Sequence, residues 1–208
     1  MIRVRQILNE LITDFNLKSF LEIGYWNGET HETIKCLNKV AVDPDPRPAL
    51  SEYTKHDVKI MSSDDFFETN KQTFDLILVD GCHEANQVYK DVVNSLNFLN
   101  PRGIIFMHDV CPLTESGTLP SASGDAFKTF MKIRCERDDL DAFLLDDFTA
   151  QDNTGFGIVI KNTGFSTRYT NSNVQYTYKF MKDRRDSIMN ISTLEYVKAC
   201  ITERNKSI

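Results

Sequence analysis

Short apolar runs alternate with polar stretches along the first 110 residues. The runs are four to six residues long, which predicts strands buried on both faces of a sheet. They cover residues 19–23, 39–42, 58–61, 74–79 and 103–107. Residues 86–99 set apolar side chains on one helical face, and the turn-forming sequence at 100–103 is expected to end that helix. This alternation predicts an α/β fold with a Rossmann-like, doubly wound and mostly parallel sheet.

The rest of the chain completes and extends this sheet. The periodicity predicts helices over residues 1–15 and 126–134, and two further strands over 142–145 and 156–160 make seven strands in all. Residues 111–125 are rich in Ser, Thr, Pro and Gly, so we expect a loop beside the ligand crevice, and a mobile lid is one role for it. We expect one domain over 1–160, then a polar connection and a C-terminal helical extension over 161–208, helical from about residue 176.

Composition and charge narrow the classes of function. The chain has 208 residues, of which 41% are hydrophobic and 26% charged, as is usual for a globular domain. A net charge of −6 argues against a nucleic-acid or membrane-surface partner. Five cysteines without a CxxC pair fit a reducing compartment. No apolar run is long enough to span a bilayer, and the first residues do not form a signal peptide, so we expect a cytoplasmic protein.

The turn after the first predicted strand, from Glu22 through Gly24 to Gly28, has features of a cofactor site. Gly24 would allow a sharp turn, and Gly28 would let the next helix begin close to the strand, with free N–H groups for an anion. A dinucleotide site needs a third glycine where Tyr25 and Trp26 stand, which argues against NAD. A plain tight turn is an equal reading of the glycine pair.

Two later strand ends could contribute to the same site. Asp43 follows the second predicted strand and could accept hydrogen bonds from a ribose diol, or, because Pro44 follows it, could simply start a turn. After the third predicted strand, Ser62, Ser63 or Asp64 is expected to cap a short helix, and this reading is favoured over a contact with adenine.

The ends of the fourth and fifth predicted strands carry the strongest group of candidate catalytic residues. Asp80 and His83 follow one strand, and His108 and Asp109 follow the other. Two carboxylates and two imidazoles are costly to bury unpaired, and strand ends of such a sheet converge on one crevice. These four residues are therefore the predicted catalytic residues. The alternative is that His83 caps a helix and His108 is a hydrogen-bonded core histidine.

Together these motifs resemble the class I S-adenosylmethionine-dependent methyltransferases. The resemblance rests on Glu22-Ile-Gly24 through Gly28, on Val42-Asp43-Pro44, on the Asp-Gly-Cys-His at 80–83 with the strand before it, and on the His-Asp at 108–109 with its own strand. It is strongest to a small bacterial and phage group with a strand-end Asp-Gly-x-His and a strand-end His-Asp. It covers residues 17–160, and residues 176–196 resemble the C-terminal helices of that group.

The resemblance implies roles at individual positions. Gly24 and Gly28 would shape the methionine pocket with Glu22 behind them. Asp43 would hold the ribose, Ser63 or Asp64 would lie near the adenine, and Asp80 would be closest to the methyl donor. Tyr25 and Trp26 would belong to the cofactor turn, although Trp26 departs from the family's usual glycine.

The implied reaction is methyl transfer to a small polar acceptor, with a hydroxyl of a sugar or sugar-linked molecule expected from the resembling group alone. His83 could remove the hydroxyl proton. Some related enzymes bind a divalent cation; Asp80 and Asp109 offer oxygen ligands for Mg²⁺ or Mn²⁺, and His108 could complete the set or only support Asp109. The limited material beyond residue 160 suggests a small acceptor or a site completed in a homo-oligomer. The alternatives are an NAD-dependent oxidoreductase and a non-catalytic binding protein.

Overall fold

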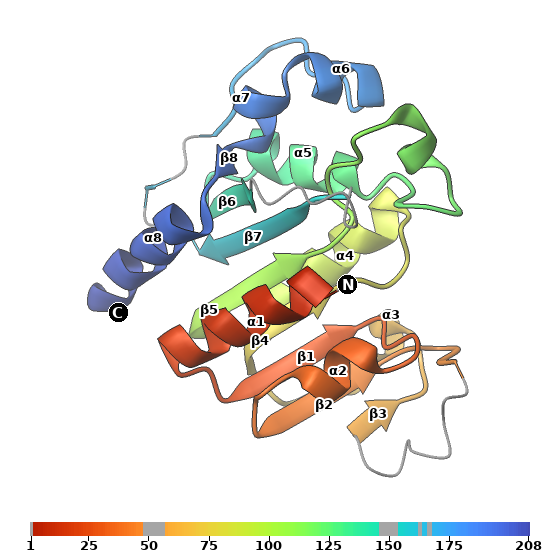
Figure 1. Ribbon diagram of the computed structural model, residues 1–208, viewed down its shortest axis with the longest axis vertical. Helices are drawn as coiled ribbons and strands as arrows, with labels where there is room; N and C mark the ends of the chain where they lie inside the picture. Colours follow the sequence, from red (N-terminus) through yellow and green to blue (C-terminus); the bar gives the residue numbers. More distant parts are fainter. Residues whose placement is uncertain (1, 48–56, 146–153, 162–163, 166–167) are drawn as a thin grey trace. The chain divides into compact units, whose positions relative to one another are not determined.

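The structure is a computed structural model that describes residues 2–47, 57–145, 154–161, 164–165 and 168–208. Within these residues eight strands form one mixed sheet in the order β3-β2-β1-β4-β5-β7-β6-β8 (Figure 1). β1 pairs in parallel with β2 and with β4, and β2 pairs in parallel with β3, whereas β6 and β7 are antiparallel. The predicted doubly wound and mostly parallel α/β fold is confirmed.

Unit 1, the first of two compact units, holds residues 1–82 and 89–105. Its elements are α1 (Ile2–Phe15), β1 (Ser19–Ile23), α2 (Glu29–Thr33), β2 (Asn38–Val42), β3 (Asp57–Lys59), α3 (Ser63–Thr69), β4 (Phe74–Val79), and most of α4 (Ala85–Asn97) and β5 (Leu99–Met107). The connections from β1 to β2 and from β3 to β4 run in opposite directions across the sheet. Because such connections are right-handed, α2 and α3 lie on opposite faces.

The helices of unit 1 follow this rule. Figure 1 shows α1 and α2 in front of β1 and β2. On the other face, α3 and α4 are joined by the buried Ser63 hydroxyl, which donates to Asp91 Oδ1 at 2.6 Å. Phe67 of α3 also stacks on Phe98 after α4, with ring centres 5.5 Å apart. β1 and β4, between these layers, are buried apart from Ser19 and Asp75, which are partly exposed.

Unit 2 holds residues 83–88 and 106–208. Its elements are the end of β5, the 3₁₀ helix η2 (Glu115–Thr118), α5 (Phe127–Glu136), β6 (Leu140–Leu145), β7 (Phe156–Lys161), α6 (Tyr178–Asp183), α7 (Arg185–Met189), β8 (Ile191–Ser192) and α8 (Leu194–Lys206). β6 and β7 pair along their whole length, from Leu140 opposite Lys161 to Leu145 opposite Phe156. Among the described helices of both units, none combines the length and apolar character needed to cross a membrane.

Two predictions about the sheet are wrong. The sheet has eight strands rather than seven, because the two residues of β8 pair in parallel with β6, and a strand of two residues leaves no pattern in the sequence. β8 also divides the predicted C-terminal helical region, after Asn190 adopts a left-handed conformation with φ +52°. The expected turn at 100–103 is instead part of β5, where the Asn100 side chain donates to Asp75 Oδ1 at 2.7 Å.

Candidate active site

The turn after β1 brings three strand ends of unit 1 together. Gly24 has φ +94°, and a Cβ there would lie 2.2 Å from the carbonyl oxygen of Asp80, so no other residue fits without a shift of the backbone. The Gly24 N–H donates to Val42 O, and the Asp80 N–H donates to Ile23 O, both at 2.9 Å. The ends of β1, β2 and β4 are thus fastened to one another, and the sharp turn predicted at Gly24 is present.

Gly28 makes room for an aromatic side chain. It has φ +78°, and a Cβ there would lie 2.4 Å from the Tyr25 hydroxyl oxygen. Tyr25 is buried and meets the His31 ring edge-on, with ring centres 5.6 Å apart. Gly28 precedes α2 as predicted, but α2 has only five residues and carries Glu29 in its first turn, which disfavours an anion there.

A buried acid and imidazole lie beneath this turn. Glu22 Oε2 is 3.0 Å from His31 Nδ1, and both side chains are inaccessible to solvent. Burial first, and then the charges of Asp80 and Asp43, raise the pKa of Glu22 well above its usual range against the opposing charge of Lys39. Sequence reasoning missed His31; the one signal was that a carboxyl group inside a predicted buried strand needs a hydrogen-bond partner.

Asp43 supports the conformation of the exposed Trp26. One carboxylate oxygen, Oδ2, accepts from the Trp26 N–H, and the other accepts from the Asp45 N–H, both at 2.9 Å. Trp26 has φ +50° and is 53% exposed, and the Arg47 guanidinium lies 4.3 Å from the centre of its ring. Asp43 therefore stabilises a turn, which is one of the two roles expected for it. Its carboxylate can accept further hydrogen bonds, so the contact with a ribose stays a prediction.

The three residues at the start of α3 have different roles. Ser62 caps the helix, since its hydroxyl oxygen accepts from the Asp65 N–H at 3.1 Å. Ser63 is buried against Asp91, as described above, and Asp64 forms an exposed ion pair with Lys90 at 3.1 Å. The predicted cap is present, and a contact of Ser63 or Asp64 with adenine stays a prediction.

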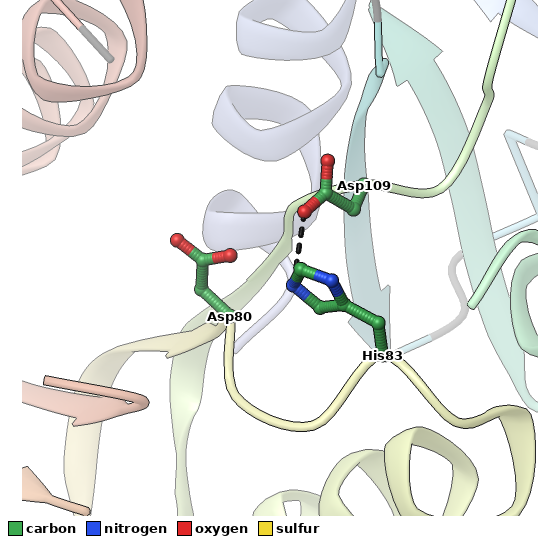
Figure 2. A group of neighbouring side chains, drawn as sticks. All are labelled: Asp80, His83 and Asp109. Atoms are coloured by element: carbon green, nitrogen blue, oxygen red, sulfur yellow. Dashed lines mark ion pairs between the residues drawn. The ribbon is translucent and has the colours of Figure 1, made fainter. Parts of the chain in front are cut away.

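His83 faces an acceptor on each side of its ring. Its Nδ1 lies 2.7 Å from the carbonyl oxygen of Ala122, and its Nε2 lies 3.0 Å from Asp109 Oδ2 (Figure 2). A carbonyl can only accept a hydrogen bond, so Nδ1 carries a proton. A carboxylate likewise can only accept, so a proton on Nε2 would be donated to Asp109 Oδ2.

Asp109 is buried at the end of β5 and keeps its negative charge. It has φ +60°, and its Oδ1 accepts from the Ser123 hydroxyl at 3.1 Å. Burial by itself raises the pKa of Asp109, but hydrogen bonding and charge from His108 and the charge of His83 lower this pKa to about 2. The carboxylate is therefore ionised near neutral pH.

His108 packs within unit 2 as well as contacting Asp109. Its side chain is buried, its ring stacks on Phe156 with centres 5.4 Å apart, and its Nδ1 lies 3.4 Å from Asp109 Oδ2. These contacts are those of a side chain that supports Asp109, which is one of the two roles expected for it.

Asp80, His83 and Asp109 form a group that could hold a metal ion. One ligand atom from each lies within 4.8 Å of the others, and no second such group occurs in the part of the chain that the structure describes. Figure 2 shows Asp80 at the start of the loop that carries His83. Two carboxylates suit Mg²⁺ or Mn²⁺, and a histidine whose other nitrogen is fixed by a carbonyl is oriented as metal ligands usually are. These residues fit a divalent cation, with His83 rather than His108 as the third member.

The 111–125 loop is fastened within unit 2 at its beginning. Tyr178 of α6 donates from its hydroxyl to Leu113 O at 2.9 Å, and Arg185 of α7 donates to Pro112 O at 2.8 Å. The sequence gives no sign of these long-range contacts. Helices α6 and α7 thus hold the beginning of the loop that follows Asp109.

The chain is similar to known methyltransferases in sequence and in fold. Residues 21–110 match the family model described as a methyltransferase domain, and every site residue predicted above lies in this range. No curated protein matches the sequence.

Three solved structures illustrate the similarity in fold. The O-methyltransferase from Bacillus cereus in complex with SAH is 15% identical, with a TM-score of 0.60 over 77% of this chain and 81% of that one. TomG from Streptomyces achromogenes, an O-methyltransferase in complex with SAM and involved in tomaymycin synthesis, is 15% identical, with a TM-score of 0.59 over 76% and 79%. The N-methyltransferase NodS from Bradyrhizobium japonicum is 16% identical, with a TM-score of 0.51 over 76% and 92%.

The fold is therefore the Rossmann-like fold of class I methyltransferases. Residues 21–110, which are less than half of the chain, match a methyltransferase domain, and the sequence motifs resemble the same class of protein. It stays a prediction that the chain belongs to the small bacterial and phage group. The division into a 1–160 domain and a 161–208 extension also stays a prediction.

Proposed function

We propose that this protein transfers a methyl group from S-adenosylmethionine to a hydroxyl group of a small acceptor. The observation that carries the proposal is the geometry of His83, whose Nδ1–H is held by a carbonyl while Nε2 faces the ionised Asp109. A carboxylate beside Nε2 stabilises the imidazolium that forms when His83 acts as a general base, and Nε2 can take the acceptor's proton only while it does not donate to Asp109. The methyltransferase family match and the shared fold support the same class of reaction.

The cofactor would bind at the strand ends of unit 1. Glu22, Gly24 and Gly28 would form the methionine side of the site, Asp43 would accept from the ribose, and Ser63 or Asp64 would lie near the adenine. Asp80 would lie closest to the methyl donor. Tyr25 is buried against His31, whereas Trp26 is exposed, so of these two we assign a direct cofactor contact to Trp26. The SAH and SAM bound to the two O-methyltransferases named above support this choice of cofactor.

The chemical step requires that the acceptor oxygen is aligned with the methyl group and that the acceptor hydroxyl loses one proton. The donor supplies an electrophilic methyl group, so a C–O bond forms to the acceptor oxygen as the C–S bond breaks. The hydroxyl proton moves to Nε2 of His83, which can accept it only while Nε2 does not donate to Asp109. The resulting imidazolium donates from Nδ1 to the Ala122 carbonyl and from Nε2 to Asp109.

A divalent cation is part of the proposal. Asp80, His83 and Asp109 would hold it, and His108 would support Asp109. The cation would lower the pKa of an acceptor hydroxyl. His83 can either contribute Nε2 as a ligand or take the proton there, so the cation requirement also decides how His83 acts.

The acceptor is proposed from chemistry and from the resemblance. NodS, with the same fold, is described as an N-methyltransferase, so the fold does not determine the methylated atom. A base next to a carboxylate is most useful for a hydroxyl, because a neutral hydroxyl is a weak nucleophile. A sugar or sugar-linked acceptor rests on the resemblance alone, as do cytoplasmic localisation and a homo-oligomer.

Calorimetric titration with S-adenosylmethionine and S-adenosylhomocysteine tests the core of the proposal. We expect saturable binding of both, and NAD serves as the control because Tyr25 and Trp26 occupy the place of the glycine that a dinucleotide requires. Failure of both ligands to bind at high micromolar concentration would reject the proposed activity.

Substitution of His83 tests the mechanism. His83→Gln should bind S-adenosylhomocysteine like the unchanged protein but lose turnover by about 100-fold or more, because glutamine cannot take the proton. Activity should also fall on treatment with a chelator and return on addition of Mg²⁺ or Mn²⁺. An activity that is indifferent to both treatments would remove Asp80 and Asp109 from the ligand role.

A further inference from the structure

The residues just before α5, Ala122 to Asp125, all contact the His83–Asp109 pair or the loop that carries it. Ala122 contributes its carbonyl to His83 Nδ1, and Ser123 its hydroxyl to Asp109 Oδ1. Gly124 packs against the backbone of His83, and the Asp125 N–H donates to His83 O at 2.9 Å. Two of these four residues thus hydrogen-bond to the side chains of His83 and Asp109, and the other two approach the backbone of His83.

We propose that the 122–125 segment is the positioning element of the active site: it fixes which nitrogen of His83 carries the proton and which oxygen of Asp109 faces it. The proposal deepens the function proposed above and rests on it for its effect on turnover. The contacts themselves all lie within unit 2 and can be tested without any reaction.

Ser123 determines the orientation of the Asp109 carboxylate. Its side chain is 1% exposed, and its hydroxyl donates to Oδ1. With Oδ1 occupied, Oδ2 is the oxygen that lies 3.0 Å from His83 Nε2. Removal of the hydroxyl would leave Oδ1 without this donor, so the carboxylate would be held less firmly in the orientation that faces His83.

Gly124 allows the segment to approach His83. It has φ +55°, and a Cβ at this position would lie 2.4 Å from the carbonyl oxygen and 2.7 Å from the Cβ of His83. Any other residue would therefore push the segment away from the loop. Because Ala122 lies only two residues earlier, its carbonyl would move away from Nδ1 as well.

Asp125 fastens the segment to the start of α4. Besides donating from its N–H to His83 O, it accepts at Oδ1 from the Ala85 N–H at 2.6 Å and pairs at Oδ2 with Lys128 at 2.8 Å. On its other side the segment continues from η2, where the Ser123 N–H donates to Gly117 O at 3.0 Å. The segment is held at both ends, as a rigid support for a reacting group must be.

Two variants separate positioning from simple stability. Ser123→Ala should lower kcat by about 10-fold or more, with KM and the affinity for S-adenosylhomocysteine within about twofold of the unchanged protein. Ser123→Thr, which keeps the hydroxyl, should recover part of the loss. Ser121→Ala is the matched control, because Ser121 is exposed and lies two residues before Ser123, just outside the 122–125 segment.

Nuclear magnetic resonance of ¹⁵N-histidine-labelled protein without ligands tests the geometry directly. Comparison with His83→Gln identifies the His83 resonances. In the unchanged protein Nδ1 should appear as a protonated nitrogen, and in Gly124→Ala this signal should shift toward that of an imidazole free to exchange between its two tautomers. A thermal melt of each variant establishes that it is folded.

The outcomes distinguish this inference from the proposed function. Unaltered His83 resonances in Gly124→Ala, or a kcat of Ser123→Ala equal to that of Ser121→Ala, would overturn the positioning role. If the unchanged protein neither binds S-adenosylmethionine nor turns over, the proposed function fails, while the resonances still decide whether the 122–125 segment fixes the His83 ring.

Discussion

Asp75 lies near the beginning of β4, whereas Asp109 follows the end of β5. Both side chains are held in the charged form, but by different groups. Asp75, near the beginning of β4, accepts from the Lys18 N–H at 2.8 Å, the Ser19 N–H at 3.1 Å and the Asn100 side chain at 2.7 Å. Burial raises its pKa, and these donors lower it below its usual value. None of these donors changes its charge near neutral pH.

Asp109, at the carboxyl end of β5, is held by donors of another kind. Its neighbours are the imidazoles of His83 and His108 and the Ser123 hydroxyl. A carboxylate surrounded by fixed donors fastens strands, whereas one next to an imidazole can stabilise a charge that appears during a reaction. A lowered carboxylate pKa therefore marks a candidate active site only when the groups that contact the carboxylate can themselves change protonation state.

Loss of the Asp109 charge is expected to have the largest effect. Asp109→Asn should lower kcat by about 100-fold or more, because the amide cannot stabilise the His83 imidazolium and is a poorer cation ligand. Steady-state kinetics with a methyl acceptor found by screening measure this loss, and Asp75→Asn is the matched control with kcat near that of the unchanged protein. Equal losses of kcat in the two variants would contradict the distinction between the carboxylates.

Removal of the Asp75 carboxylate should chiefly affect stability. Asp75→Ala leaves two backbone N–H groups and the Asn100 amide without their acceptor, which should lower the free energy of unfolding by about 2 kcal/mol. Urea denaturation followed by circular dichroism gives this value. A variant with unchanged stability and reduced kcat would reverse the roles assigned here.

The stability that Asp75 provides should depend on pH. Because folding lowers the pKa of Asp75, this contribution is fully present above the ordinary Asp pKa of about 3.9 and disappears as the pH falls through the lower value of the folded state. The difference in unfolding free energy between the unchanged protein and Asp75→Asn should therefore shrink between neutral pH and about pH 3. Denaturation at a series of pH values checks this, and a difference that grows on acidification would be inconsistent with it.

The helix cap at Ser62 should give the smallest effect. Ser62 lies after β3, on the side where we expect the cofactor. Its hydroxyl oxygen accepts from the Asp65 N–H, which is a fixed donor like those around Asp75. Ser62→Ala should cost about 1 kcal/mol of stability and leave the affinity for S-adenosylhomocysteine unchanged. A loss of affinity without a loss of stability would instead make Ser62 part of the cofactor site.

Much of the architecture could be predicted because it depends on local pattern. β1 and β4 have the predicted boundaries, since each is a short and mostly apolar run between polar residues. β5 begins earlier than predicted because Asn100 and Pro101, which usually form turns, are accommodated in a strand by the contact with Asp75. The two residues of β8 form a strand only because β6 lies beside them.

The sequence by itself determined the mostly parallel sheet apart from β8 and the beginning of β5, the sharp turn at Gly24, and the acids and imidazoles that follow β4 and β5. These features follow from the periodicity of side chains and from the position of each residue in its own strand or turn. Only the tertiary structure decided that His31 pairs with Glu22, that Ser123 holds Asp109 and that the Ala122 carbonyl holds His83. Such partners are small or common residues, separated in the sequence from the groups they hold, so their roles exist only once the chain has folded.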